Sequence, residues 1–215
     1  METVLILDFG AQYSQLIARR VREQNVYCEV KPCSISPDEI RKLSPIGIIL
    51  SGGPQSVYES VSLHVDPALF ALGIPVLGIC YGCQLMAYSL GGTVAAATEA
   101  TAREYGKTLT EFDTQSAIFQ GLPVSSVTWM SHGDYISQVP DGFTVTAKTA
   151  VCPTAAMACP EKKLYGVQFH PEVQHTVQGS EILRRFLYSV CGASGDWTMA
   201  DYRQTAIRAI REKVG

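Results

Sequence analysis

Three short runs of apolar residues constrain the fold of this chain more than any other feature. They lie at residues 4–7, 47–50 and 76–79, and each ends in a glycine or a polar turn. Such a run is typical of a strand that is buried on both faces of a sheet. Another strand is predicted at 26–31, and helices are predicted at 13–24, from Ser36 onward and at 66–72. This alternation of strands and helices predicts a doubly wound, mostly parallel sheet.

The middle of the sequence follows another pattern. β-forming residues separated by turns predict strands between 92 and 110, and at 127–130, 143–147, 155–158 and 164–169. Helices are predicted at 180–191 and 199–214, and the glycines at 192 and 195 indicate a linker between them. We therefore expect an α/β fold in which the mostly parallel sheet carries a smaller antiparallel β subregion.

Composition and charge limit the partners that we expect. A formal net charge of −3 gives no basic surface for nucleic acid. No apolar run reaches the roughly 20 residues that a membrane-spanning helix needs, and the first residues lack the pattern of a signal peptide. Seven cysteines, an odd number, indicate reduced thiols. We expect a cytoplasmic protein without nucleic-acid or membrane partners.

A cysteine lies where the strand at 76–79 meets a predicted helix. The stretch Gly78-Ile79-Cys80-Tyr81-Gly82 has a glycine on each side of Cys80, which permits a tight and strained turn. This arrangement is typical of a nucleophile elbow, which more often carries serine. The positive end of the following helix favours the thiolate form of a cysteine. Cys80 is therefore the candidate nucleophile.

A cysteine nucleophile needs a base and a group that orients the base. His170 follows the last predicted strand, and Glu172 lies two residues further along, where an extended chain places it on the same side. A lone histidine at the end of a strand is more often structural than catalytic. Together with the elbow cysteine, however, His170 and Glu172 predict a catalytic group.

A glycine pair follows the strand at 47–50, in the stretch Ser51-Gly52-Gly53-Pro54. Glycines allow backbone N–H groups to approach a ligand closely. In doubly wound sheets ligands bind at the carboxyl ends of the strands, where this pair and Cys80 are both expected. Gly53 and the residue after the nucleophile, Tyr81, could form an oxyanion hole, although a Gly-Gly-Pro stretch alone is more often a plain turn.

Two other kinds of function stay open on these residues. Cys80 and Cys83 form a CxxC motif at a strand-to-helix turn, which is also typical of thiol-disulfide redox proteins. That interpretation gives no role to His170, Glu172 or the glycine pair. A regulatory domain that binds glutamine without cleaving it is a further alternative. No metal site is expected, because no second closely spaced pair of cysteines or histidines exists.

Three motifs together resemble the class I (triad type) glutamine amidotransferases, which have a flavodoxin-like fold: residues 78–84, residues 169–172 and residues 51–54. The resemblance implies hydrolysis of L-glutamine to glutamate and ammonia. It implies that Cys80 is the nucleophile, His170 the general base and acid, and Glu172 the orienting carboxylate. It also implies oxyanion-hole N–H groups at Gly53 and Tyr81. The implied glutamine contacts are Gly52, Gln84, Ser131, His132 and Gly133.

Further stretches, at residues 5–13, 18–23, 48–54 and 129–134, resemble members of this family that work with an ATP pyrophosphatase domain. The resemblance implies an amidotransferase domain over 1–191, then a linker and the start of an interdomain helix over 192–215. The ammonia would convert XMP to GMP in an ATP pyrophosphatase domain of the same longer chain, which would use ATP and magnesium. No cofactor is implied for the amidotransferase domain itself, and a homodimer is implied only for the full-length enzyme.

Overall fold

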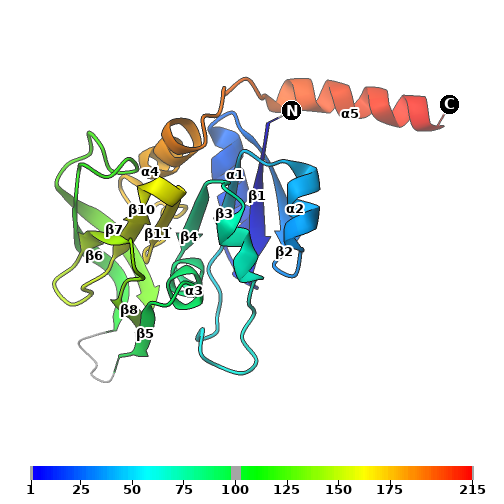
Figure 1. Ribbon diagram of the computed structural model, residues 1–215. Helices are drawn as coiled ribbons and strands as arrows, with labels where there is room; N and C mark the ends of the chain where they lie inside the picture. The colour runs from blue at the N-terminus through cyan, green and yellow to red at the C-terminus, as the bar shows by residue number, and fades with distance from the viewer. Residues whose placement is uncertain (1, 98–102, 215) are drawn as a thin grey trace.

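A computed structural model describes residues 2–97 and 103–214 and is built around one mixed β-sheet (Figure 1). In the described part of the chain this sheet has nine strands in the order β2-β1-β3-β4-β11-β10-β9-β6-β7. The pairs from β2 to β11 are parallel, and the pairs from β11 to β7 are antiparallel. The sheet therefore has a parallel half and an antiparallel half, as the sequence predicts.

The parallel half contains the three apolar runs that the sequence shows, together with β2 and β11. Their bounds are Thr3–Asp8 (β1), Tyr27–Pro32 (β2), Gly47–Leu50 (β3), Val76–Ile79 (β4) and Leu164–Val167 (β11). Every residue of β3, β4 and β11 is buried, which explains why these strands lack a polar face. Because these strands run in one direction, their carboxyl ends meet at one edge of the sheet.

The antiparallel half is formed by later parts of the chain. Its strands are Glu104–Phe112 (β6), Ser125–His132 (β7), Thr144–Lys148 (β9) and Ala156–Cys159 (β10). Thr93–Ala96 (β5) and Asp134–Gln138 (β8) pair separately as a small antiparallel sheet. The sequence did not predict β8, which follows β7 after the single residue Gly133. The chain bends at Gly133, and β8 then pairs with β5 while β7 pairs with β6.

Helices cover both faces of the sheet and define two apolar cores. One face packs against Ser14–Glu23 (α1) and Gly179–Arg185 (α4), which a π-helical turn, Phe186–Val190, extends. The other face packs against Pro37–Leu43 (α2), the 3-10 helix Pro67–Ala71 and Tyr81–Ser89 (α3). A second 3-10 turn, Pro160–Lys162, joins β10 to β11. This layered arrangement confirms the predicted fold class.

The C-terminal helix Met199–Val214 (α5) extends away from the sheet (Figure 1). Its first turn rests on an aromatic cluster, in which the ring of Tyr27 lies 5.4 Å from Tyr202 and 6.0 Å from Trp197. The division of the chain at residue 191 stays a prediction. No helix within residues 2–97 and 103–214 has the length and apolar character that crossing a membrane requires.

Candidate active site

Cys80 lies between β4 and α3 in a strained backbone conformation. Its φ is 52° and its ψ is −108°, a region that residues with a Cβ rarely adopt. Its backbone is fixed on both sides, since Cys80 N–H donates to Val167 O on the neighbouring strand and Cys80 O accepts from Cys83 and Gln84 N–H. The predicted elbow is therefore present, with the strain at the cysteine itself.

The two glycines of the elbow serve close packing. A Cβ on Gly78 would lie 2.6 Å from Gly82 O, and a Cβ on Gly82 would lie 2.5 Å from Leu50 O. Both distances are far shorter than a normal carbon–oxygen contact, so neither position accepts a side chain. From the sequence we expected the glycines to adopt the strained conformation, whereas they allow helix α3 to lie directly against β3 and β4.

His170 and Glu172 lie in the turn after β11, next to Cys80. His170 Nδ1 donates to Glu172 Oε1 at 2.8 Å, and the other side of the ring hydrogen-bonds Cys80. Both side chains are buried. The three residues therefore form a chain in which the imidazole ring lies between the thiol and the carboxylate.

The pKa of His170 is strongly shifted by its neighbours. Burial disfavours the charged ring and lowers the pKa, but hydrogen bonds to Cys80 and Glu172 outweigh burial and raise it from 6.5 to about 10. A His170 ring that keeps its proton at neutral pH can act as an acid toward a leaving amine.

The turn that carries His170 and Glu172 is fixed by long-range contacts. His170 N–H donates to Trp129 O at 3.0 Å, and Thr176 Oγ1 donates to His170 O at 2.6 Å. Arg20 Nε on α1 donates to Glu172 O at 2.9 Å. These bonds place the base and its carboxylate without using their reactive atoms.

The glycine pair after β3 covers the elbow. A Cβ on Gly52 would lie 3.4 Å from His170 Cε1, and a Cβ on Gly53 would lie 3.1 Å from Phe9 O. Tyr81 is the first residue of α3, where the N–H groups of a helix have no intrahelical acceptor. The backbone of Gly53 and Tyr81 is thus beside Cys80, as an oxyanion hole requires.

A cavity of about 320 Å³ opens at Cys80. Several predicted ligand contacts line it together: Gly53, Tyr81, Gln84, Ser131, His132 and Gly133. The wall formed by residues 131–134 comes from the end of β7, the bend at Gly133 and the start of β8. The volume lies in the range of sites for small molecules. A larger hollow of about 600 Å³ near α2 has neither cysteine nor histidine in its lining.

Buried amides connect Cys80 to this wall, and one of them was not predicted from the sequence. Gln168 Nε2 donates to Cys80 Sγ at 3.6 Å, and Gln168 Oε1 accepts from Gln84 Nε2 at 3.0 Å. Gln84 Nε2 also donates to Asp134 O at 2.9 Å. The available signal was Gln168 itself, a polar residue between the apolar Val167 and Phe169.

The outer rim of the cavity contains further residues that the sequence did not indicate. Gln55, Ser56, Tyr105 and Asp134 line it. Tyr58 Oη donates to Asp134 Oδ1 at 3.0 Å and so joins the loop after β3 to β8. These residues meet only because two distant loops approach each other, and no local pattern marks them.

The structure argues against a redox pair of Cys80 and Cys83. Cys83 is fully buried and belongs to the core on one face of the sheet, whereas Cys80 packs with the core on the other face. Burial raises the pKa of the Cys83 thiol well above its usual value. A Cβ on Gly166 would lie 2.5 Å from Cys83 Sγ, so this thiol fills a tightly packed space. Cys83 is a core residue.

A cysteine, a histidine and a glutamate at the carboxyl edge of a mostly parallel sheet are the arrangement expected of a cysteine-dependent amidotransferase, and comparison with known proteins shows this class. The profile of the family "Glutamine amidotransferase class-I" matches residues 5–190. The chain belongs to this family and is an enzyme. The predicted family resemblance is confirmed, and the comparisons give no support to the redox alternative.

Curated relatives indicate a particular branch of the family. The chain is 53% identical over 214 residues to the "GMP synthase [glutamine-hydrolyzing]" of Clostridium botulinum (strain Alaska E43 / Type E3), and 56% identical over 214 residues to that of Acetivibrio thermocellus. In both comparisons 100% of this chain is covered, but only 41% of the relative. The chain thus spans less than half the length of the relatives that it matches.

Solved structures show the same fold. A Thermoplasma acidophilum protein, described as one of the subunits of a GMP synthase, matches with a TM-score of 0.77 and 30% identity, over 96% of this chain and 98% of that chain. A glutamine amidotransferase from Thermotoga maritima matches with a TM-score of 0.69 over 89% of this chain and 99% of that chain. At 20% identity this second match shows the fold alone.

Proposed function

We propose that this chain hydrolyses L-glutamine to glutamate and ammonia through a thioester on Cys80. The observation that carries the proposal is the Cys80–His170–Glu172 chain of hydrogen bonds beside a cavity of amino-acid size. The thiolate attacks the side-chain amide carbon, and the N–H groups of Gly53 and Tyr81 hold the oxyanion. Losing one such donor typically costs about 2.7–4 kcal/mol of transition-state stabilisation.

His170 provides the proton transfers of this reaction. As the imidazolium it protonates the departing ammonia, and as the neutral ring it then activates the water that releases glutamate. Glu172 holds the ring with Nδ1 protonated, so that the other ring nitrogen serves Cys80. Gly52, Gln84, Ser131, His132 and Gly133 would contact the bound glutamine.

We further propose that the ammonia serves an ATP pyrophosphatase domain of a longer chain, in which XMP is converted to GMP. The support is the similarity to full-length GMP synthases, of which this chain covers 41%. In this proposal residues 1–191 form the amidotransferase domain, and 192–215 lead to the partner domain. ATP and magnesium act in that domain, and the homodimer belongs to the full-length enzyme. Seven unpaired cysteines fit a cytoplasmic enzyme.

Glutamate release from this chain, compared between Cys80→Ala and Cys83→Ala, tests the glutaminase. Cys80→Ala should lower the rate by at least about a thousandfold, because the nucleophile is lost. Cys83→Ala, which removes a buried core thiol three residues away, is the matched control and should change the rate only a few-fold. Equal losses in both variants would contradict the proposal.

A second measurement tests the glutamine site even if the isolated chain hydrolyses glutamine slowly. An electrophilic chloroketone analogue of glutamine should alkylate Cys80 alone, as seen by peptide mass spectrometry. Excess L-glutamine should protect this thiol. Labelling without protection would exclude a glutamine site next to Cys80.

A further inference from the structure

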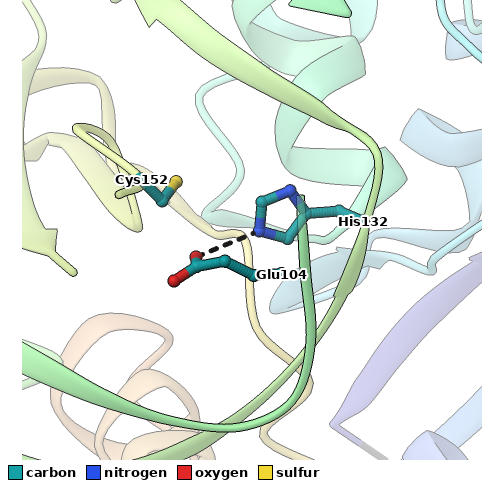
Figure 2. Close-up of side chains that lie close together, drawn as sticks. All are labelled: Glu104, His132 and Cys152. Carbon is teal, nitrogen blue, oxygen red and sulfur yellow. Dashed lines mark ion pairs between the residues drawn. The ribbon is translucent and has the colours of Figure 1, made fainter. Parts of the chain in front are cut away.

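A second group of a cysteine, a histidine and a glutamate lies outside the catalytic chain. Glu104 begins β6 and His132 ends β7, and the two are direct partners in the antiparallel register. Cys152 comes from the loop between β9 and β10. One ligand atom from each residue lies within 4.8 Å of the other two, and all three side chains are buried. Figure 2 shows these side chains coming from separate segments toward one region.

The tautomer of His132 follows from its contacts. His132 Nδ1 lies 2.9 Å from Asp134 O, and a carbonyl oxygen can only accept, so Nδ1 carries the hydrogen. In the neutral ring Nε2 is then a bare lone pair. His132 Nε2 lies 3.4 Å from Glu104 Oε2 (Figure 2). Two hydrogen-bond acceptors therefore lie side by side in a buried site.

Neither of these facing atoms is satisfied. Glu104 Oε2 and His132 Nε2 have no hydrogen-bond partner among the residues that the structure describes. The residues are only 6% and 4% exposed. Unpaired buried acceptors are costly, and a native protein normally satisfies them. A cation between the two atoms would satisfy both.

The other polar atoms of these residues make hydrogen bonds like those that orient the ligands of a bound metal. Thr149 Oγ1 donates to Glu104 Oε1 at 2.7 Å and accepts from Cys152 N–H at 2.8 Å. Metal-bound histidines usually donate their other ring N–H to a carboxylate or a backbone carbonyl, as His132 does to Asp134 O. The ligand atoms are therefore oriented while Oε2 and Nε2 stay available.

We propose that Glu104, His132 and Cys152 form a binding site for a zinc-class divalent cation. Imidazole, thiolate and carboxylate are the ligands that Zn²⁺ prefers. With zinc–ligand bonds of about 2.0–2.2 Å, a tetrahedral site separates nitrogen and oxygen ligands by about 3.4 Å. Glu104 and His132 already have this separation. The sulfur, which is within 4.8 Å, would approach by about 1 Å to reach its own bond of about 2.3 Å.

Charge and protons balance in this site. The Cys152 thiol gives its proton to solvent as the zinc–sulfur bond forms, and the two anionic ligands then neutralise the dication. Three protein ligands leave a fourth position for water. Since His132 also lines the cavity at Cys80, the bound ion would fix the bend at 131–134. The ion takes no part in chemistry at Cys80 in this proposal.

Cobalt substitution tests the site through a readout that does not depend on activity. The chain carries Cys80→Ala, so that the active-site thiol cannot bind the metal, and is treated with chelator and then titrated with Co²⁺. We expect one Co²⁺ per chain, with the visible absorption of tetrahedral cobalt and a thiolate-to-cobalt charge-transfer band. Zn²⁺ should displace the cobalt and remove both signals.

Two further variants assign the ligands. Adding Cys152→Ala should abolish the charge-transfer band, whereas adding Cys28→Ala, which removes another buried thiol, should leave it intact. Glu104→Gln keeps the shape and the bond from Thr149 and should weaken Co²⁺ binding at least tenfold. Circular dichroism verifies that each variant is folded. Two results would overturn the proposal: a charge-transfer band that survives Cys152→Ala, or no Co²⁺ binding in the Cys80→Ala protein. Either result would mean that a proton, not a metal ion, lies between Glu104 and His132.

Discussion

The two cysteine–histidine–glutamate groups of this chain differ in what the imidazole ring faces. In the first group the His170 ring lies between its two partners. Its Nδ1 donates a hydrogen bond to Glu172, and the ring also hydrogen-bonds Cys80. In the second group His132 Nδ1 is held by a backbone carbonyl, and Nε2 faces Glu104. The first arrangement places the ring between a thiol and the carboxylate that orients it. The second directs three ligand atoms toward one region. Residue type alone does not distinguish a catalytic group from a binding site.

The cysteines of the two groups differ as well. Cys80 has a strained backbone and lines the cavity, so it can meet a substrate. Cys152 is in a buried loop, where burial and the nearby Glu104 raise the pKa of its thiol to about 12. A thiol that stays protonated at neutral pH is a poor nucleophile. The strained backbone and the cavity at Cys80 support our proposal that Cys80, not Cys152, is the nucleophile.

The same substitution in both groups should give the largest difference. Glu172→Gln should lower the glutaminase rate by roughly a hundred- to ten-thousandfold, because an amide cannot hold His170 in the required tautomer as a carboxylate does. Glu104→Gln should change the rate by less than about tenfold, because its new amide can donate to His132 Nε2. Steady-state kinetics of the two variants measures this contrast.

Thermal unfolding serves as the control for that pair. Glu104→Gln should leave the metal-free protein as stable as the parent or more stable, since it pairs an unsatisfied atom. If Glu104→Gln lowered the rate as much as Glu172→Gln while remaining folded, the assignment of the two groups would be wrong.

An intermediate effect is expected from the amide that contacts the nucleophile. Gln168→Leu removes the donor to Cys80 Sγ at similar volume and should lower the rate by roughly 10- to 100-fold, because hydrogen bonds to charged groups contribute about 1.5–3 kcal/mol. The rate of Cys80 alkylation as a function of pH provides an independent measurement, because it reports on the environment of the sulfur directly. An unchanged alkylation profile would show that Gln168 only packs against the elbow.

The smallest effect is on stability as a function of pH. The pKa of His170 is about 10 in the folded protein and 6.5 in its ordinary state, so its protonated form stabilises the fold. This contribution is complete below about pH 6.5 and is lost as pH rises to about 10. Relative to a His170→Gln variant, the parent should lose at most about 1.4 kcal/mol of unfolding free energy per pH unit in this window. Urea unfolding at several pH values checks this, and parallel curves for the two proteins would contradict the pairing.

Several features could be predicted from the sequence because their signals are local. The apolar runs of β1, β3 and β4 indicated the parallel half, and the glycines around Cys80 indicated the elbow. His170 and Glu172 are two residues apart, so their contact needed no knowledge of the fold. Strand β8 was missed because its five residues follow β7 after only one residue, so no separate turn marks its start.

Contacts between distant segments could not be predicted in this way. The bond from Gln168 to Cys80 depends on β11 lying beside β4, and the bond from Tyr58 to Asp134 depends on two loops meeting. No metal site was expected from the sequence either, because that expectation considered only closely spaced cysteines and histidines. Glu104 and His132 face each other through the β6–β7 register instead.

The sequence by itself determined the alternation of strands and helices, the elbow at Cys80 and the neighbouring base and carboxylate. These depend on side-chain periodicity and on residues a few positions apart. Only the tertiary structure decided that Cys83 belongs to a different core from Cys80, and that a second cysteine, histidine and glutamate converge at Cys152. Strand pairing and loop closure bring such residues together. The residues between them in the sequence show no local pattern that indicates the contact.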